Sequence, residues 1–393
     1  MTGRQRWIRF LLVSWLAITC WGAAIPATEA QGQLFQSTDL FAGGELGVNT
    51  YRIPALVQTK SGTLIAIADA RRDSAGDLPG HITLVMRRSF DDGVSWTAAK
   101  TVRSPTEGGV GDASLLLDKK TGRVWCFFAF GPPGIGFMTS HAGTRTGPST
   151  LQVHAMYSDD DGNNWSVPAD LTPQIKDVTW QGLFATSGTN IQTSKGRYLV
   201  PLVVRDAHGV VSARNAYSDD AGKTWKVGQS LGAGTDESHA IELKGGTILQ
   251  NIRDGYTRLV ARSPDGGITF SNPEPDPALI DPKCNAGIAH FKRGNQDILI
   301  FTNAASRKRE NLTVRLSFNG GHTWPNAKLL AAGPAGYSTV VPLRDGTIAV
   351  LYERGARSST ERITFARFNL QWIARARTKG DISQELEQQA RFH

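Results

Sequence analysis

The chain alternates apolar and polar residues in short runs, and this pattern predicts many β-strands. Five of these runs end in serine, and they read LVMRRS, VHAMYS, ARNAYS, LVARS and TVRLS. A second set of apolar runs, several of them preceded by a turn that contains glycine, predicts further strands at 63–68, 122–129, 197–204, 247–252, 297–302 and 347–352. Strands of this length, separated by glycine-rich turns, indicate an all-β protein.

A polar motif of eight residues follows each of the five runs that end in serine. It reads Ser-x-Asp-x-Gly-x-Thr-Trp with mild substitutions and begins at residues 89, 158, 218, 263 and 317. Its Asp and Gly predict a tight hairpin, and we expect its aromatic residue to pack beneath that hairpin. The intervals of 69, 60, 45 and 54 residues favour a repeat architecture of propeller blades. We interpret the motif as structural, because its polar side chains can satisfy the backbone of a turn.

The six apolar runs of the second set and the five motifs predict an all-β fold, a six-bladed β-propeller, over residues 31–375. One of the six blades lacks a recognisable motif.

Residues 1–30 combine three arginines, an apolar run from Phe10 to Trp21 and small residues at 28–30, which indicates a secretory signal peptide. An uncleaved anchor is the alternative. We therefore expect a secreted or periplasmic protein without stable membrane insertion after cleavage. We predict no function for the polar tail at 376–393.

Charge and composition narrow the function classes. The formal charge is +8, and it falls to +6 without the first 30 residues, but Lys and Arg form no long run. This argues against nucleic-acid binding. Cys126 and Cys284 remain after removal of the signal peptide, and they could pair or stay free. The eight histidines show no metal-ligand spacing and no phosphate loop is present, so we expect no metal and no cofactor.

Charged and phenolic residues interrupt the strand patterns at five places. The first is Arg52 in YRIP, and the second is Arg71 in DARR with Asp77 after it. The third is Glu237 with Arg253, the fourth is Arg307 with Arg309 in ASRKREN, and the fifth is Tyr337 with Glu353. Arginines at the ends of strands on separate blades could together bind a carboxylate, since guanidinium groups match carboxylate geometry.

These elements, in this order, resemble the bacterial exo-α-sialidases (neuraminidases) of glycoside hydrolase family 33, which are six-bladed propellers with Asp-box hairpins. The resemblance extends over residues 34–369. It implies that Arg52, Arg253 and Arg309 bind the carboxylate of sialic acid. It further implies roles for five residues: Tyr337 as the nucleophile, Glu237 as its activating base, Asp77 as the acid/base, Arg71 as a substrate contact and Glu353 as the partner of Arg52.

Three of these assignments have rivals nearby in the chain. Arg307 competes with Arg309, and Arg72 competes with Arg71. Asp73 competes with Asp77, which we prefer because it precedes Pro79 in an Asp-x-Pro pattern. A tyrosine nucleophile is the known exception that sialidases make among glycosidases.

The resemblance implies a secreted exo-α-sialidase that removes terminal α-linked sialic acids from glycoproteins, glycolipids and oligosaccharides. The reaction would proceed with retention through a covalent tyrosyl intermediate, and we expect a monomer. The alternatives are a trans-sialidase, a glycosidase for a related nonulosonic acid, and a non-catalytic propeller that binds glycans. The sequence does not predict the preferred linkage, whether α2,3, α2,6 or α2,8.

Overall fold

The computed structural model describes residue 32 and residues 34–374, apart from 294 and 295. The predicted signal peptide at 1–30 and the polar tail at 376–393 lie outside the described residues. Among the described helices, none has the length and apolar character that crossing a membrane requires.

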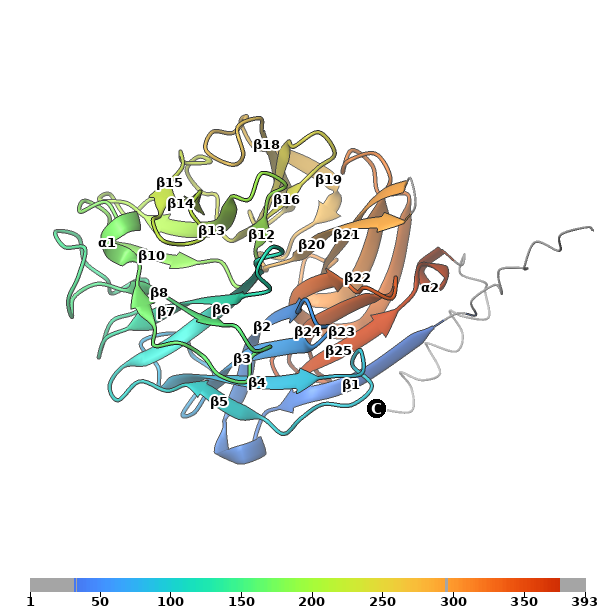
Figure 1. The fold of residues 1–393 in the computed structure, drawn as a ribbon, viewed down its shortest axis with the longest axis horizontal. Helices are drawn as coiled ribbons and strands as arrows, with labels where there is room; N and C mark the ends of the chain where they lie inside the picture. Colours follow the sequence, from blue (N-terminus) through green and yellow to red (C-terminus); the bar gives the residue numbers. More distant parts are fainter. Residues whose placement is uncertain (1–31, 33, 294–295, 375–393) are drawn as a thin grey trace, which may run out of the picture. The chain divides into compact units, whose positions relative to one another are not determined.

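Antiparallel sheets follow one another in chain order around a common centre (Figure 1). Blade 1 contains β2 (Thr50–Gln58), β3 (Leu64–Arg71), β4 (Ile82–Ser89) and β5 (Lys100–Arg103). Blade 2 contains β6 (Gly109–Leu117), β7 (Val124–Gly131), β8 (Gln152–Ser158) and β9 (Ala169–Asp170), with the short β11 (Gly188–Thr189) parallel to β6. Blade 3 contains β10 (Gly182–Ala185), β12 (Ile191–Gln192), β13 (Tyr198–Arg205), β14 (Val211–Ser218) and β15 (Lys226–Val227).

Blade 4 contains β16 (Ser238–Glu242), β17 (Ile248–Ile252), β18 (Thr257–Ser263) and β19 (Glu274–Ile280). Blade 5 contains β20 (Gly287–Arg293), β21 (Gln296–Ala304), β22 (Glu310–Ser317) and the first half of β23 (Asn326–Pro342). Blade 6 contains the second half of β23, β24 (Ile348–Arg354), β25 (Arg362–Phe368) and β1 (Phe35–Ala42). The helices are short: η1 (Glu45–Gly47), α1 (Thr172–Ile175) and α2 (Leu370–Ala374).

The prediction of a six-bladed propeller is confirmed. The six apolar runs of the second set, from 63–68 to 347–352, form the second strands of the blades. The five runs that end in serine form third strands. Apart from the short β11, the strands of each blade pair antiparallel, and the apolar side chains of each blade pack against the neighbouring blade. For example, Leu116 of β6 shares one apolar cluster with Tyr198 and Trp225 of blade 3.

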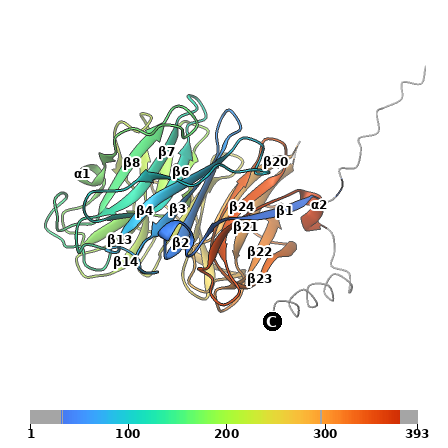
Figure 2. The same ribbon diagram turned by 90° about the horizontal axis from the view of Figure 1, so that it is seen from below.

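Blade 6 is completed by the first described strand, which the sequence analysis did not anticipate. β1 pairs with β25 from Phe35 opposite Phe368 to Ala42 opposite Arg362, and Figure 2 shows β1 along this edge. The two ends of the propeller are thereby joined by a ladder of hydrogen bonds. Such closure protects a strand edge that would otherwise be open.

The repeated motifs, the Asp boxes, are hairpins held by their own side chains. In the box at 218–225, Ser218 Oγ accepts the N–H of Gly222 at 2.9 Å and donates to Asp220 at 2.8 Å. Asp220 also accepts from the hydroxyl and the N–H of Thr224, and these hydrogen bonds lower the pKa of Asp220 to about 2. The serine-to-glycine contact recurs in the boxes that begin at 89, 158, 263 and 317.

The box glycines also join adjacent blades. Gly222 has φ +87°, and a Cβ at this position would lie 2.8 Å from the ring of Trp125 in the preceding blade. The other box glycines approach side chains of their preceding blades in the same way, namely Phe365, Ile65, Leu199 and Leu249. Only glycine fits both the left-handed conformation and this close approach.

Gly222→Ala is therefore expected to lower the free energy of unfolding by about 2–4 kcal/mol, from backbone strain and from overpacking against Trp125. Gly196→Ala is the matched control: Gly196 has φ +90° but nothing within 4 Å of an added Cβ. The control should cost about 1 kcal/mol, from the backbone alone. Denaturant unfolding of both variants measures the difference, and equal losses would contradict the packing argument.

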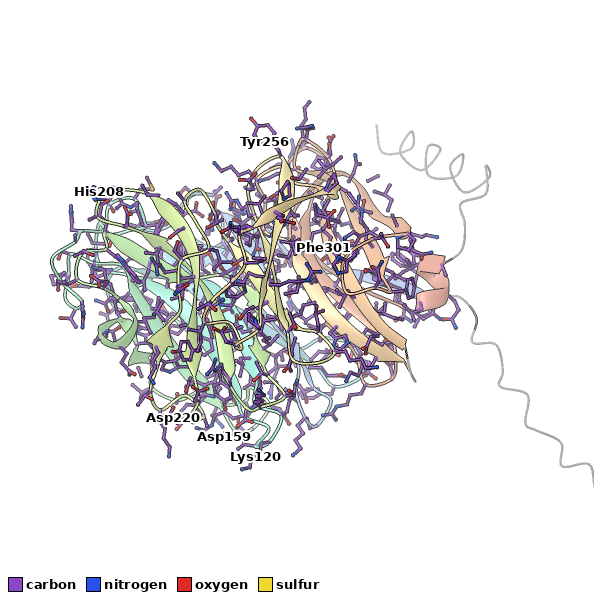
Figure 3. The ribbon with its side chains drawn as sticks, turned by 90° about the horizontal axis from the view of Figure 1, so that it is seen from above. Lys120, Asp159, His208, Asp220, Tyr256 and Phe301 are labelled. Atoms are coloured by element: carbon purple, nitrogen blue, oxygen red, sulfur yellow. The ribbon has the colours of Figure 1, made fainter. Side chains whose placement is uncertain are left out.

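The boxes and the charged strand ends lie at opposite ends of the blades. In blade 1, Arg71 pairs with Ile82 at one end of the β3–β4 ladder, and Leu64 pairs with the box residue Ser89 at the other. Figure 3 shows the same separation between Tyr256, which follows β17, and Asp220 of a box. The end away from the boxes therefore carries the candidate chemistry.

Candidate active site

A cavity of about 530 Å³ opens at the strand ends away from the boxes. The sequence-predicted residues that line it are Arg52, Asp77, Glu237, Arg253, Arg309 and Tyr337. They come from blades 1, 4, 5 and 6, each of which contributes a strand end or a loop to this face. Arg71 and Glu353 lie directly behind the lining and contact it.

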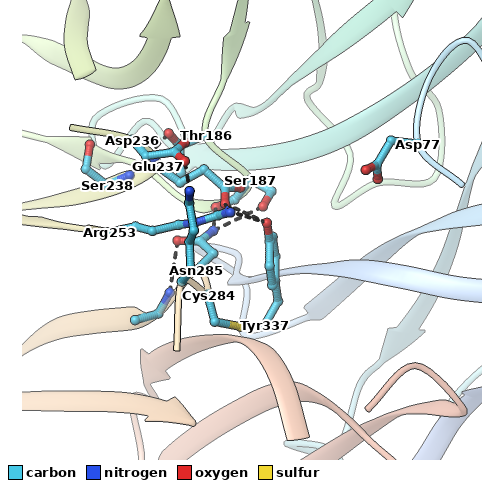
Figure 4. Close-up of polar contacts among 12 residues, drawn as sticks. Asp77, Thr186, Ser187, Asp236, Glu237, Ser238, Arg253, Cys284, Asn285 and Tyr337 are labelled. Atoms are coloured by element: carbon cyan, nitrogen blue, oxygen red, sulfur yellow. Dashed lines mark hydrogen bonds and ion pairs between the residues drawn. The ribbon is translucent and has the colours of Figure 1, made fainter. Parts of the chain in front are cut away.

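The Tyr337 hydroxyl lies between a carboxylate and a guanidinium. It donates to Glu237 Oε2 at 2.5 Å and accepts from Arg253 Nη1 at 2.9 Å. Arg253 also forms an ion pair with Glu237 (Figure 4). Burial and the charge of Glu237 hold the pKa of Tyr337 well above its usual range, and burial raises the pKa of Glu237. The phenol is thus neutral and is already hydrogen bonded to the group that could take its proton.

Three arginines converge on Tyr337. The guanidinium carbons of Arg52 and Arg309 lie 5.1 and 5.5 Å from the centre of its ring, and Arg253 contacts its hydroxyl. Arg309 Nη2 is fixed by the carbonyl of Lys283 at 2.8 Å. The structure places Arg309 at the cavity, whereas the guanidinium of Arg307 lies over the ring of Tyr256. Three guanidinium groups around one cavity provide a strong site for a carboxylate.

Glu353 fixes Arg52 and the backbone beside Tyr337. Its Oε1 accepts from Arg52 Nε at 3.0 Å and from the N–H of Ile53 at 2.9 Å. Its Oε2 accepts from Arg52 Nη2 at 3.2 Å and from the N–H of Tyr337 at 3.0 Å. Ile53 has φ +61° at a bulge in β2, a conformation that is strained for a β-branched residue. The hydrogen bond to Glu353 stabilises this bulge, which directs Arg52 into the cavity.

Asp77 lies on the loop between β3 and β4, across the cavity from the Tyr337 hydroxyl (Figure 4). Its side chain is 79% exposed and pairs with Arg71 Nη2 at 2.6 Å and with Arg52 Nη1 at 4.0 Å. The rival residues point elsewhere. Asp73 pairs with His81, and Arg72 donates to the Leu46 carbonyl and to Thr83.

A pair of acidic residues beside Arg71, the buried Asp69 and the half-buried Asp112, was not predicted from the sequence. Asp69 accepts from the N–H of Asp112 at 3.1 Å and from Arg71 at 3.4 Å. Burial raises the pKa of Asp69 to about 7, although the charge of Arg71 opposes this rise. Asp112 lines the cavity, and burial and the charge of Asp69 raise its pKa well above the usual range. Asp112 interrupts the strand pattern GVGDASLLL as Arg52 interrupts its own strand, and that signal could have identified it.

The cavity also has an apolar wall that the sequence analysis missed. This wall contains Leu78, Pro79, Phe137, Met138, Leu151, Phe184 and Val211. Phe137 and Phe184 pack edge to face at 5.0 Å. The cavity therefore combines charged and apolar lining residues, which suits a ligand with an anionic group and an apolar substituent.

Both remaining cysteines are buried and free. Cys284 packs in a small apolar cluster with Ile53 and Tyr337, so its side chain supports the floor of the cavity. Within the described part of the chain, no group of three or more His, Cys, Asp or Glu is arranged to hold a metal ion.

Comparisons with known proteins agree with this geometry. Residues 62–350 match the model of the BNR repeat-like domain family. The chain is 36% identical over 402 residues to a sialidase of Micromonospora viridifaciens, an alignment that covers 94% of this chain and 60% of that protein. The chain thus spans less than two thirds of the length of this relative.

Two solved structures share the fold. The Hadza microbial sialidase Hz136 superposes with a TM-score of 0.81 at 31% identity, covering 86% of this chain and 69% of that one. A Trypanosoma rangeli sialidase solved in complex with sialic acid gives a TM-score of 0.70 at 20% identity, covering 85% and 58%. The family model, the identity over most of the chain and the shared fold together show that the chain belongs to the sialidase family.

Proposed function

We propose that the protein is a secreted exo-α-sialidase that hydrolyses terminal α-linked sialic acids of glycoconjugates with retention. The observation that carries this proposal is the Tyr337 hydroxyl, held between Glu237 and Arg253 and facing a cavity with two further arginines. The Trypanosoma structure supports the ligand class, because that protein of the same fold binds sialic acid.

Substrate binding would use the charge of the cavity. The carboxylate on the anomeric carbon C2 of sialic acid binds Arg52, Arg253 and Arg309, which places C2 above the Tyr337 hydroxyl. An Asp or Glu nucleophile would meet that carboxylate as a like charge, whereas a neutral phenol does not. The apolar wall faces the other side of the sugar ring.

In the first step Tyr337 Oη attacks C2 and gives its proton to Glu237, and a C2–O bond to tyrosine forms. Asp77 donates a proton to the glycosidic oxygen on the opposite face, and the bond from C2 to the leaving group breaks. Arg253 contacts both Glu237 and the phenol oxygen, so it can balance the negative charge as it moves between them.

In the second step Asp77 removes a proton from water, and the water oxygen attacks C2 of the tyrosyl intermediate. The C2–O bond to Tyr337 breaks, and the proton returns from Glu237 to the phenol. Two displacements at C2 leave its configuration unchanged, which accounts for retention.

Asp77→Ala tests the proposal through the leaving group. An aryl α-sialoside with a good leaving group needs little protonation, whereas the sugar of sialyllactose needs a general acid. We expect kcat/KM to fall about 100-fold on sialyllactose and about 10-fold or less on the aryl substrate. Asp73→Ala, four residues earlier on the same loop, should change neither value by more than about twofold. Folded wild-type protein that releases no sialic acid from either substrate would overturn the proposed function.

A further inference from the structure

Asp69 is a buried carboxylate that the proposed reaction does not use. It lies on β3 two residues before Arg71, so both side chains point to the same face of the strand. The side chain of Asp69 is 1% exposed. Its Oδ1 accepts from the N–H of Asp112 at 3.1 Å, and its Oδ2 lies 3.4 Å from Arg71 Nη2. A carboxylate buried to this extent is retained only where a neighbouring group balances its charge or where it holds a proton.

Arg71 connects Asp69 to the proposed acid/base. The same atom that contacts Asp69, Nη2, also forms an ion pair with Asp77 Oδ1 at 2.6 Å. Nη1 donates to the carbonyl of Ala75 at 2.7 Å, on the loop that carries Asp77. The side chain of Arg71 is 2% exposed, and its Nε has no hydrogen-bond partner among the described residues. Water therefore contributes little to solvating the charge of Arg71, which depends on these two carboxylates.

The other cation near Asp77 has its own counterion. Arg52 lies 4.0 Å from Asp77, but its guanidinium makes two hydrogen bonds to the buried Glu353, at 3.0 and 3.2 Å. The charge of Arg52 therefore stays balanced when Asp77 gains or loses a proton, whereas the charge of Arg71 needs Asp69.

The remaining titratable neighbours of Asp69 are neutral. Burial and the charge of Asp69 hold the pKa of Asp112 well above its usual range, so Asp112 holds a proton. Burial also raises the pKa of Cys126, whose thiol interacts with Asp69 from β7. Neither group can replace Asp69 as the counterion of Arg71.

The charges of Asp69 and Asp77 are linked through Arg71. A general acid carries its proton when it acts, so Asp77 is then uncharged and Asp69 is the carboxylate that can balance Arg71. Burial raises the pKa of Asp69 to about 7; Arg71 opposes this rise, and the charge of Asp77 adds to it. A proton on Asp77 removes that addition and favours the ionised form of Asp69. By linkage, an ionised Asp69 favours the protonated form of Asp77.

We propose that Asp69 is a positioning residue for the acid/base: it is the counterion of Arg71 while Asp77 carries the proton for the leaving group. This inference rests on the proposed function. Asp69 does not line the cavity and acts through Arg71. The guanidinium of Arg71 stays in place while Asp77 gives up its proton in the first step and takes one from water in the second.

Asp69→Asn removes this charge and keeps the size of the side chain. The amide oxygen can still accept from the N–H of Asp112, so the bulge of β6 beside Gly111 keeps its hydrogen bond. Loss of the negative charge favours the ionised form of Asp77, so the fall of kcat/KM on sialyllactose at high pH should begin about 0.5–1 pH unit lower. On that limb the loss is about 3- to 10-fold. The aryl α-sialoside, which needs little protonation, should lose no more than about twofold.

Two further variants separate this role from a structural one. Asp118→Asn alters a carboxylate that is 3% exposed and lies at the box end of blade 2, and it should leave both pH profiles unchanged. Arg71→Gln removes a cation that favours the ionised form of Asp77, so the same limb should move to higher pH. An unmoved limb in Asp69→Asn, or an equal loss on both substrates, would overturn the inference.

A titration without turnover tests the same coupling. In protein that contains isotope-labelled aspartate, the carboxyl signal of Asp77 is identified by its loss in Asp77→Asn and is followed against pH by NMR. The pH at which half of Asp77 is protonated should fall by about 0.5–1 unit in Asp69→Asn and rise in Arg71→Gln. An unchanged midpoint in either folded variant would overturn the inference. Folded wild type that cleaves no sialoside would refute the hydrolase proposal alone, and the titration would still decide the role of Asp69.

Discussion

Replacing Tyr337 with phenylalanine is expected to lower kcat/KM on α-sialosides by about 10³-fold or more. The substitution removes the oxygen that would bond to C2, together with the hydrogen bonds to Glu237 and from Arg253. Glu237 and Arg253 remain paired with each other, so neither charge is left alone in the cavity. We therefore expect the variant to fold and to bind substrate while it loses turnover.

Tyr352→Phe is the matched control. Tyr352 lies on the neighbouring strand β24, is buried in the core and does not line the cavity. Its loss of a phenol oxygen should leave kcat/KM within about twofold. The anomer released first, followed by NMR, should have the α configuration for wild type and control. Full activity of Tyr337→Phe by the same retaining route would show that another group is the nucleophile.

The blades could be predicted because their signals are local. A strand that ends in Ser, followed by Asp, Gly and an aromatic residue, encodes a turn within eight residues, and its repetition sets the number of blades. The pairing of β1 with β25 joins residues more than 300 positions apart. No local pattern in residues 35–42 identifies β25 as their partner, so only the structure shows the closure of blade 6.

The candidate site likewise contains residues that the sequence predicts and others that only the structure reveals. Arg52, Glu237 and Tyr337 stand out because each places a polar group at the end of an apolar strand. The choice between Arg307 and Arg309 depends on side-chain direction, which two residues of an irregular loop do not reveal. The contact with the Lys283 carbonyl brings Arg309 to the cavity. The apolar wall around Phe137 comes from a long loop without a repeating pattern, and sequence offered no signal for it.

Replacing Glu353 with glutamine is expected to lower the free energy of unfolding by about 3–5 kcal/mol and to reduce activity as well. Glu353 is fully buried and accepts four N–H groups, two from Arg52 and one each from Ile53 and Tyr337. A glutamine amide can accept at its oxygen only, and its NH₂ would face two donors. The buried charge of Arg52 would lose its counterion, and Asp77, at 4.0 Å and largely exposed, would compensate only weakly.

Asp219→Asn is the matched control, because it breaks an ion pair of the same geometry that is exposed to solvent instead of buried. The carboxylate of Asp219 accepts two hydrogen bonds from Arg197, at 2.7 and 3.0 Å, in the same bidentate arrangement as Glu353 with Arg52. Its side chain is 55% exposed, however, so water can solvate both ions when the pair is broken. Its loss should cost at most about 1 kcal/mol and leave kcat/KM unchanged.

Denaturant unfolding and kinetics on an aryl α-sialoside measure both variants. If Glu353→Gln cost no more than Asp219→Asn, the strained bulge at Ile53 would hold Arg52 in place without Glu353. A larger loss, joined to a higher KM, would mean that one buried carboxylate organises both the first arginine of the cavity and the backbone of Tyr337.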